Sequence, residues 1–280
     1  MCEFCHRHGE GKKWYLDARN YSEDLLSDLK RRRFVRRFFA DPQHLVNGDR
    51  ALSVVDWIPR FLTKRLREKI TARQKSNHFG QVVPIEDIEK IFGFVTSVTR
   101  LACICRHIEF GGEQRFCYGL SLAPGGGEML RILREVDPSY LIGPRTQGLE
   151  NMAKEDALDL IRESEKDGMC HTVWTFKTPF IGGICNCSLP GCLAMKTTLS
   201  HKTPVMFRAE YQASVDTDVC TGCGRCARVG PFRAIPDVSK KGKARIILGK
   251  CYGCGVCRSV CEFGAISLSD RAADLATVSR

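Results

Sequence analysis

Two cysteine motifs near the C-terminal end constrain the fold of this chain more than any other feature. Each motif places three cysteines at intervals of three residues, and a further cysteine stands four residues after the second motif. These residues are Cys220, Cys223, Cys226, Cys251, Cys254, Cys257 and Cys261. Grouping this tight is typical of ligands around a metal centre, whereas a disulfide framework belongs to secreted chains. The spacing therefore predicts a metal-binding unit over residues 211–268.

The same spacing indicates that the metal centres are iron–sulfur clusters. A Cys-x-x-Cys-x-x-Cys loop holds three corners of a cubane, and the fourth cysteine of each motif ligates the cluster of the other motif. The first cluster is then predicted to bind Cys220, Cys223, Cys226 and Cys261. The second is predicted to bind Cys251, Cys254 and Cys257.

The second cluster lacks its fourth cysteine, because Gly230 stands at that position and has no side chain to bind iron. Three outcomes are open: a [3Fe-4S] cluster, a [4Fe-4S] cluster with a ligand from elsewhere or from solvent, or an empty half-site. We expect an occupied cluster with fewer irons or altered ligation, since the motif otherwise persists and Pro231 still follows the gap.

Six more cysteines fall in residues 81–210, as two Cys-x-Cys arms that each have a third cysteine downstream. They are Cys103, Cys105, Cys117, Cys185, Cys187 and Cys192. Six thiols exceed the four ligands of one cubane or one zinc ion. We expect at least one additional metal site here, with iron–sulfur favoured and zinc as the alternative, and we interpret Cys170 as a small buried thiol.

Two further cysteines, Cys2 and Cys5, lie at the N-terminus beside His6 and His8. They are candidates to complete a metal site. Cys2-x-x-Cys5-His6 also matches the attachment pattern of a c-type haem, but that reading needs export. The N-terminus has no apolar export segment, so we expect a cytoplasmic protein without haem.

The chain is basic, with a formal net charge of +11. Such a charge favours an acidic protein partner or a membrane surface; no helix-turn-helix, RNA-binding or zinc-finger motif supports nucleic acid. A predicted helix over residues 56–75 carries an apolar stripe that includes Trp57, Phe61 and Leu66, with basic residues on its other faces. The stripe is interpreted as core beneath a solvated basic face, or else as a docking surface for anionic lipid or an acidic subunit, and in the second case membrane contact would be peripheral.

The predicted fold class is α+β, in three parts: a basic helical region over residues 1–80, a cysteine-rich α/β domain over 81–210, and a two-cluster domain with short antiparallel strands and a tail over 211–280. Helices are expected at 20–40, 84–92, 128–135 and 152–166, and strands at 171–176, 213–215, 234–238, 244–248 and 265–268.

With seven of eight ligand cysteines in place, residues 211–268 resemble the dicluster bacterial-type ferredoxin domain family. The longer pattern of Cys103-Ile104-Cys105-Arg106, a helix ending near His171, and Cys185-Asn186-Cys187 resembles uncharacterised ferredoxin-domain redox proteins of anaerobic bacteria and archaea. This resemblance implies a cytoplasmic electron-transfer subunit that works beside a larger oxidoreductase. No catalytic residue is assigned. The alternatives are an iron–sulfur reductase with an open-coordination cluster acting on a small molecule, and a redox or metal sensor.

Overall fold

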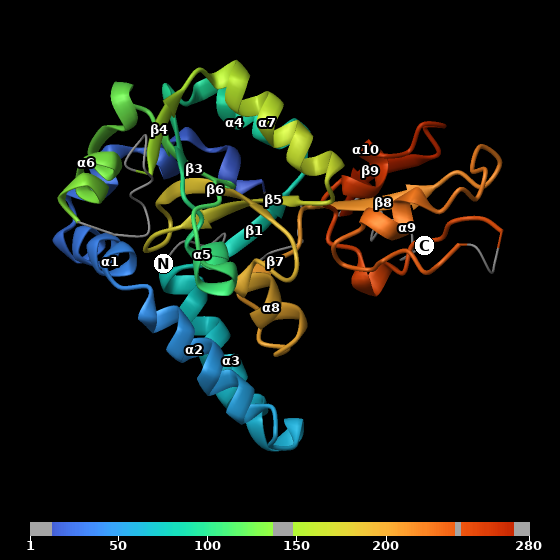
Figure 1. Ribbon diagram of the computed structural model, residues 1–280, viewed down its shortest axis with the longest axis horizontal. Coiled ribbons are helices and arrows are strands. Elements are labelled where there is room, and N and C mark those ends of the chain that lie inside the picture. The colour runs from blue at the N-terminus through green and yellow to red at the C-terminus, as the bar shows by residue number, and fades with distance from the viewer. Residues whose placement is uncertain (1–12, 137–147, 239–241, 272–280) are drawn as a thin grey trace.

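The computed structural model describes residues 13–136, 148–238 and 242–271 of the chain. A seven-stranded sheet with helices on both faces forms the larger part, and a smaller unit with two cysteine loops lies beside it (Figure 1). The α+β class is therefore confirmed. The proposed division at residues 80 and 210 stays a prediction.

The large sheet runs in the order β4-β2-β3-β6-β5-β1-β7, and all its pairs are antiparallel except β1 with β7. Its strands are β1 (Gly80–Val83), β2 (Ser97–Leu101), β3 (Cys117–Ser121), β4 (Leu149–Met152), β5 (Cys170–Thr175), β6 (Ile181–Cys187) and β7 (Met206–Phe207). Cysteines stand at or beside the ends of four of these strands, so the sheet decides which of them meet.

One face of the sheet is covered by α4 (Ile85–Phe94) and α7 (Lys154–Lys166). Each helix presents an apolar stripe, and Ile88, Ile91 and Ile161 are fully buried against the sheet. Gly168 ends the α7 segment with a positive φ of 87°, as the sequence predicts for a helix stop. Strand β5 begins two residues later, so the packing of α7 on the sheet positions the start of this strand.

The opposite face is covered by α1 (Leu29–Ala40), α5 (Ile104–Phe110), α6 (Gly127–Glu135) and α8 (Leu193–Leu199), with the short turns η4 (Glu23–Ser27) and η5 (Pro124–Gly126) nearby. The turns η2 (Trp14–Leu16) and η3 (Ala18–Tyr21) instead pack in the core beneath α4 and α7. The single helix expected over residues 20–40 is in fact broken. Asp28 caps α1 by accepting a hydrogen bond from the Lys30 amide, and the preceding turn η4 is capped by Ser22.

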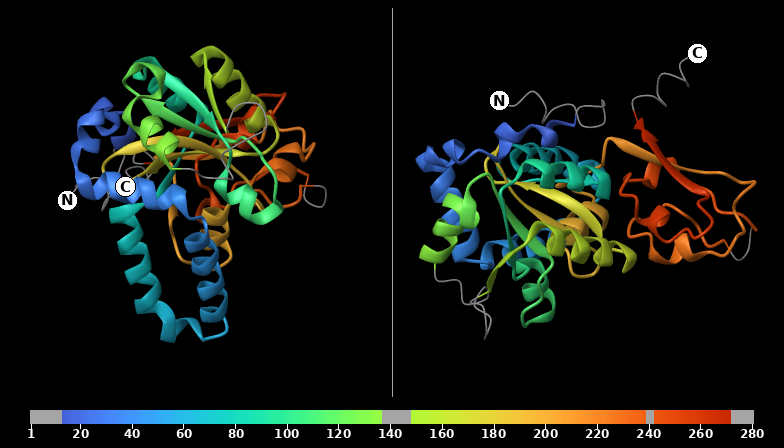
Figure 2. Two further views of the ribbon diagram at one scale, coloured as in Figure 1. Left: turned by 60° about the vertical axis from the view of Figure 1, so that its left-hand side comes forward. Right: turned by 90° about the horizontal axis from the view of Figure 1, so that it is seen from above.

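Two long helices, α2 (Gln43–Val55) and α3 (Arg60–Asn77), form a hairpin that projects from the body (Figures 1 and 2). The core interpretation of its apolar stripe is wrong: Trp57 is 90% exposed and Phe61 78%. The buried face of α3 instead carries Thr63 and Arg67, because the Arg67 guanidinium reaches Asp56 and the His201 carbonyl. Polar contacts thus set the rotation of this helix.

The smaller unit contains β8 (Tyr211–Val215) paired antiparallel with β9 (Ile266–Asp270), the short helices α9 (Arg225–Val229) and α10 (Val256–Ser259), and the turn η6 (Leu248–Lys250). The strands predicted near 213–215 and 265–268 are therefore present. Those predicted at 234–238 and 244–248 are not formed, since these segments are irregular loops around the cysteine motifs. No helix in the described part of the chain combines the length and apolar character needed to span a membrane.

Candidate iron–sulfur site

Both cysteine loops have the same backbone, which follows from paired glycines. Gly222 and Gly224 each have a φ of 74°, and Gly253 and Gly255 have φ values of 68° and 85°. These left-handed conformations favour glycine. At Gly222 a Cβ would lie 1.9 Å from the Gly242 carbonyl oxygen, so close backbone approach excludes any side chain there.

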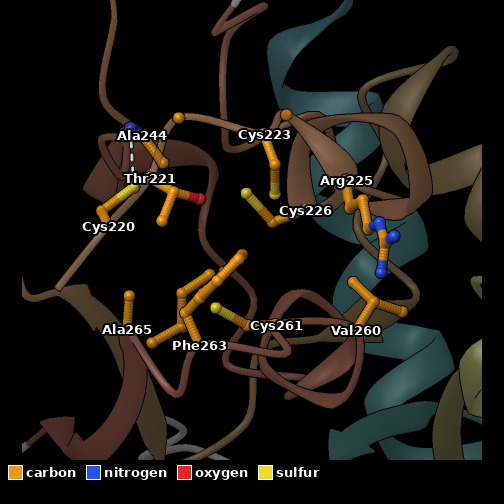
Figure 3. Close-up of a pocket in the computed structure, with 13 residues that line it drawn as sticks. Cys220, Thr221, Cys223, Arg225, Cys226, Ala244, Val260, Cys261, Phe263 and Ala265 are labelled. Carbon is orange, nitrogen blue, oxygen red and sulfur yellow. Dashed lines mark hydrogen bonds between the residues drawn. The ribbon is translucent and has the colours of Figure 1, made fainter.

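The first cysteine set surrounds one cavity. Cys220, Cys223 and Cys226 come from the first loop, and Cys261 reaches the same cavity from beyond the second loop (Figure 3). The Ala244 amide donates to the Cys220 sulfur over 3.4 Å. Convergent thiols, a backbone amide aimed at sulfur and an apolar wall that includes Phe263 fit a cubane.

The second set lies deeper, because Cys251 and Cys254 are buried whereas Cys223 is exposed. The Ala213 amide donates to the Cys251 sulfur over 3.5 Å, which repeats the contact at Cys220. Burial raises the pKa of Cys257 to about 12. A buried thiolate is unfavourable unless a cation offsets its charge, so these features fit cysteines whose thiolates are bound to iron.

Gly230 occupies the position of the missing ligand, directly after α9. Its φ of −61° and ψ of 109° are open to any residue, and a Cβ there would meet only the Cys226 carbonyl oxygen, at 3.2 Å. The backbone therefore retains a conformation that a cysteine could adopt. The second cluster lacks this ligand because glycine has no side chain, and not because the loop has an unusual conformation.

The six central cysteines come together on one face of the large sheet. Cys117 on β3 is directly opposite Cys185 on β6, and their sulfurs lie 3.1 Å apart. Cys187 shares that face because it is two residues further along β6. Helices α5 and α8 place the other three thiols above this face, with Cys103 beside Cys105 and Cys117, and Cys192 beside Cys105 and Cys187. We call this set the central thiol group.

Hydrogen bonds from Cys105 and Cys117 hold the pKa of Cys103 well below its usual range, and those neighbours have raised pKa values in turn. Arg106 lies nearby and adds positive charge. Its guanidinium donates to Ser188 over 2.8 Å and rests on the Phe116 ring, 4.3 Å from the centroid. The central thiol group therefore stabilises at least one deprotonated thiol.

Within the described residues, no three His, Cys, Asp or Glu side chains are arranged as ligands of a single metal ion. This applies equally to the cysteines around the first cavity, which suit a larger multi-iron unit. Metal binding by the central thiol group stays a prediction. Cys2 and Cys5, with His6 and His8, lie outside the described residues.

Two buried groups lie beside the clusters: Cys170, which is a buried thiol as predicted, and Glu165, which was not predicted. Cys170 lies within electrostatic range of both Cys254 and Cys192, so it stands between the second loop and the central thiol group. Glu165 is 4% exposed and abuts Gly255. The burial of Glu165 could be predicted from the helical period, because Glu165 lies four residues after the buried Ile161 and so on the same face of α7. No signal in the sequence places Cys170 between the second loop and the central thiol group.

Fold and site together define an iron–sulfur protein in which two cysteine loops, related by their backbone conformation, hold adjacent clusters. Comparison with known families gives the same answer, since residues 212–262 match the 4Fe-4S dicluster domain. A ferredoxin of Pyrobaculum islandicum is 34% identical over 73 residues, which are 26% of this chain and 67% of that protein. Through this C-terminal domain the chain belongs to the dicluster ferredoxin family, whose clusters serve electron transfer.

Proposed function

We propose that this protein is an electron-transfer subunit that relays electrons between a soluble carrier and a larger oxidoreductase. The observation that carries the proposal is the graded burial of the two cysteine sets. Cys223 of the first set is exposed, whereas Cys251 of the second set is buried in the core of the small unit and Cys254 in the core shared with the large sheet. Electrons would enter at the surface and move inward through the second cluster.

The entry side is basic. Arg225 and Arg228 line a groove beside Cys261, and Arg228, Arg233 and Lys250 line a second groove that includes Cys223. Cations of this kind attract an acidic carrier and accelerate its docking. They also favour the reduced state of the nearby cluster by stabilising added negative charge.

The docking surface can be tested by charge reversal. Arg228→Glu should slow reduction by an acidic ferredoxin several-fold at low salt, with the difference shrinking at high salt because exposed charges are screened. Arg65→Glu, an exposed change on the projecting hairpin, is the matched control and should leave the rate unchanged. Equal rates for all three proteins at low salt would contradict the proposed entry side.

A reductase is the second candidate function, because Gly230 itself lines the basic groove that contains Arg233 and Lys250. An iron without a cysteine ligand at this corner would be open to a small anion. Turnover of nitrite or sulfite that disappears in Gly230→Cys would support a reductase. Electron transfer without turnover supports the relay.

A further inference from the structure

We propose that the central thiol group holds an iron–sulfur cluster of its own, which continues the electron path beyond the second ferredoxin cluster. The proposal begins from convergence. Six thiols reach one spot from β3, β6, and the starts of α5 and α8, and each has another as its neighbour. Thiols that merely fill a core have no reason to gather in this way.

The chemistry of the cysteine ligands limits which metal centre the central thiol group can bind. Thiolates are soft ligands that select iron–sulfur clusters, zinc or cuprous copper. A structural zinc ion takes four ligands, and this group offers six. All fourteen cysteines of the described residues are free, so no disulfide consumes any of the six. Arg106 would offset part of the cluster's negative charge from beside Cys103.

The six cysteines of the central thiol group differ in burial. Cys103, Cys187 and Cys192 are buried, whereas Cys105, Cys117 and Cys185 keep partial exposure. Cys187 and Cys192 belong to the core that continues toward the ferredoxin domain.

A continuous path joins this site to the second cluster. Cys254, Cys170 and Cys192 belong to one buried core that spans both parts of the molecule. Cys170 is directly opposite Cys187 in the β5–β6 register, and it lies within electrostatic range of Cys254. One electron would pass along this path, oxidising the second cluster and reducing the central cluster, with no atom transferred.

Metal content tests the site. In wild-type protein prepared without oxygen, we expect more iron per chain than the eight that two cubanes hold, with matching labile sulfide and little zinc. Iron at or below about eight, or stoichiometric zinc, would overturn the proposal. This count does not depend on whether any variant folds.

The double change Cys117→Ser and Cys185→Ser should remove up to about four irons per chain. The electron paramagnetic resonance (EPR) signals of the ferredoxin clusters should remain, and they report that the variant is folded. Cys170→Ala is the matched control, a buried thiol of the same core placed outside the group, and should keep its iron. Loss of iron in Cys170→Ala, or unchanged iron in the double variant, would overturn the ligand assignment.

The projecting hairpin carries a second inference from an independent observation. Its tip exposes large apolar side chains far from the sheet: Val54, Trp57, Ile58, Phe61 and Leu62. Exposed basic side chains follow along α3: Arg60, Lys64, Arg65, Lys69 and Arg73. Glu68 is the one acidic residue between positions 57 and 73.

We infer that this tip inserts into an anionic lipid surface. Aromatic and aliphatic side chains enter the headgroup region, while neighbouring lysines and arginines are attracted to anionic lipids. The charge complementarity favours a bilayer over an apolar protein groove. Insertion would hold the electron-transfer unit at a membrane without spanning it.

Trp57 supplies the readout, because Trp14 and Trp174 are 3% and 7% exposed and so report little change. Vesicles of phosphatidylcholine with phosphatidylglycerol should shift tryptophan emission to shorter wavelength and sediment the protein. Trp57→Ala with Phe61→Ala should abolish sedimentation, and Leu29→Ala, exposed elsewhere, should not. Failure to bind these vesicles would overturn the inference, as would a dimer in solution that the double variant dissociates.

Discussion

The rings of Phe232 and Tyr252 stack in parallel, with centroids 4.0 Å apart and planes within 5°. Phe232 lies two residues beyond Gly230, and Tyr252 directly follows Cys251. The stack therefore ties the backbone at the ligand gap to the second cysteine loop. Because Phe232 also belongs to the core that contains Cys254, the position of the second cluster depends on this contact.

Phe232→Ala should destabilise the protein by about 3–5 kcal/mol, since it removes a buried ring and leaves a cavity beside the loop. We expect iron of the second cluster to be lost before that of the first during thermal unfolding, followed by absorbance and EPR. Phe61→Ala, on the exposed hairpin tip, should change stability by less than about 0.5 kcal/mol. Equal effects of the two changes would show that the stack has no role in holding the loop.

Gly230→Cys should complete the second ligand set, because the backbone there already accepts a side chain. Wild-type protein should show an oxidised three-iron EPR signal. The variant should lose it and gain about one iron per chain, after a shift of a few tenths of an ångström at Cys226. Ser267→Cys adds a thiol on exposed β9 and should leave the signal in place. A three-iron signal that persists in Gly230→Cys would contradict this assignment.

Cys261→Ser tests which loop this residue serves. Its thiol faces the cavity of Cys220, Cys223 and Cys226, so the change should alter only the first cluster. The expected result is a new three-iron or altered four-iron signal, with the second cluster's signal unchanged. A changed signal from the second cluster instead would refute the crossed ligation.

Glu165 gives a pH dependence. Burial raises its pKa from 4.5 to about 7, and its Oε1 atom has no hydrogen-bond partner. The folded state therefore binds more protons than the unfolded state between these values, so stability falls as pH rises through that window. Above pH 7 the loss reaches about 3 kcal/mol.

Glu165→Gln should remove this loss. Its unfolding free energy should exceed that of wild type by an amount that grows from pH 6 to pH 8, the range in which urea unfolding can be compared. Glu163→Gln, exposed on the same helix, is the control and should follow wild type. A constant difference between Glu165→Gln and wild type across this range would contradict the raised pKa.

The ferredoxin domain could be predicted from the sequence because its cluster ligands are close together along the chain. Metal geometry fixes the spacing of Cys220, Cys223 and Cys226, and the loops then need glycine where the backbone turns left-handed, as at Gly222. The convergence of the central thiol group depends instead on strand register. Only the pairing of β3 with β6 brings Cys117 against Cys185, and sequence distance gives no hint of it.

The exposure of the apolar stripe on the hairpin has a physical reason. An apolar stripe at helical spacing normally faces a core, but Trp57 and Ile58 lie in the turn before α3 begins at Arg60. The buried face of α3 was decided by Arg67, which contacts Asp56, Thr203 and the His201 carbonyl. A buried arginine with long-range partners cannot be recognised before those partners are placed.

The central claim is that residues 220–261 hold two redox-active iron–sulfur clusters. Iron and labile sulfide, measured with EPR spectra on anaerobic full-length protein before and after dithionite, test it most directly. We predict about seven or more irons per chain, equivalent sulfide, an oxidised three-iron signal before reduction and a reduced four-iron signal after it. Fewer than about four irons, or zinc in their place, would contradict the account.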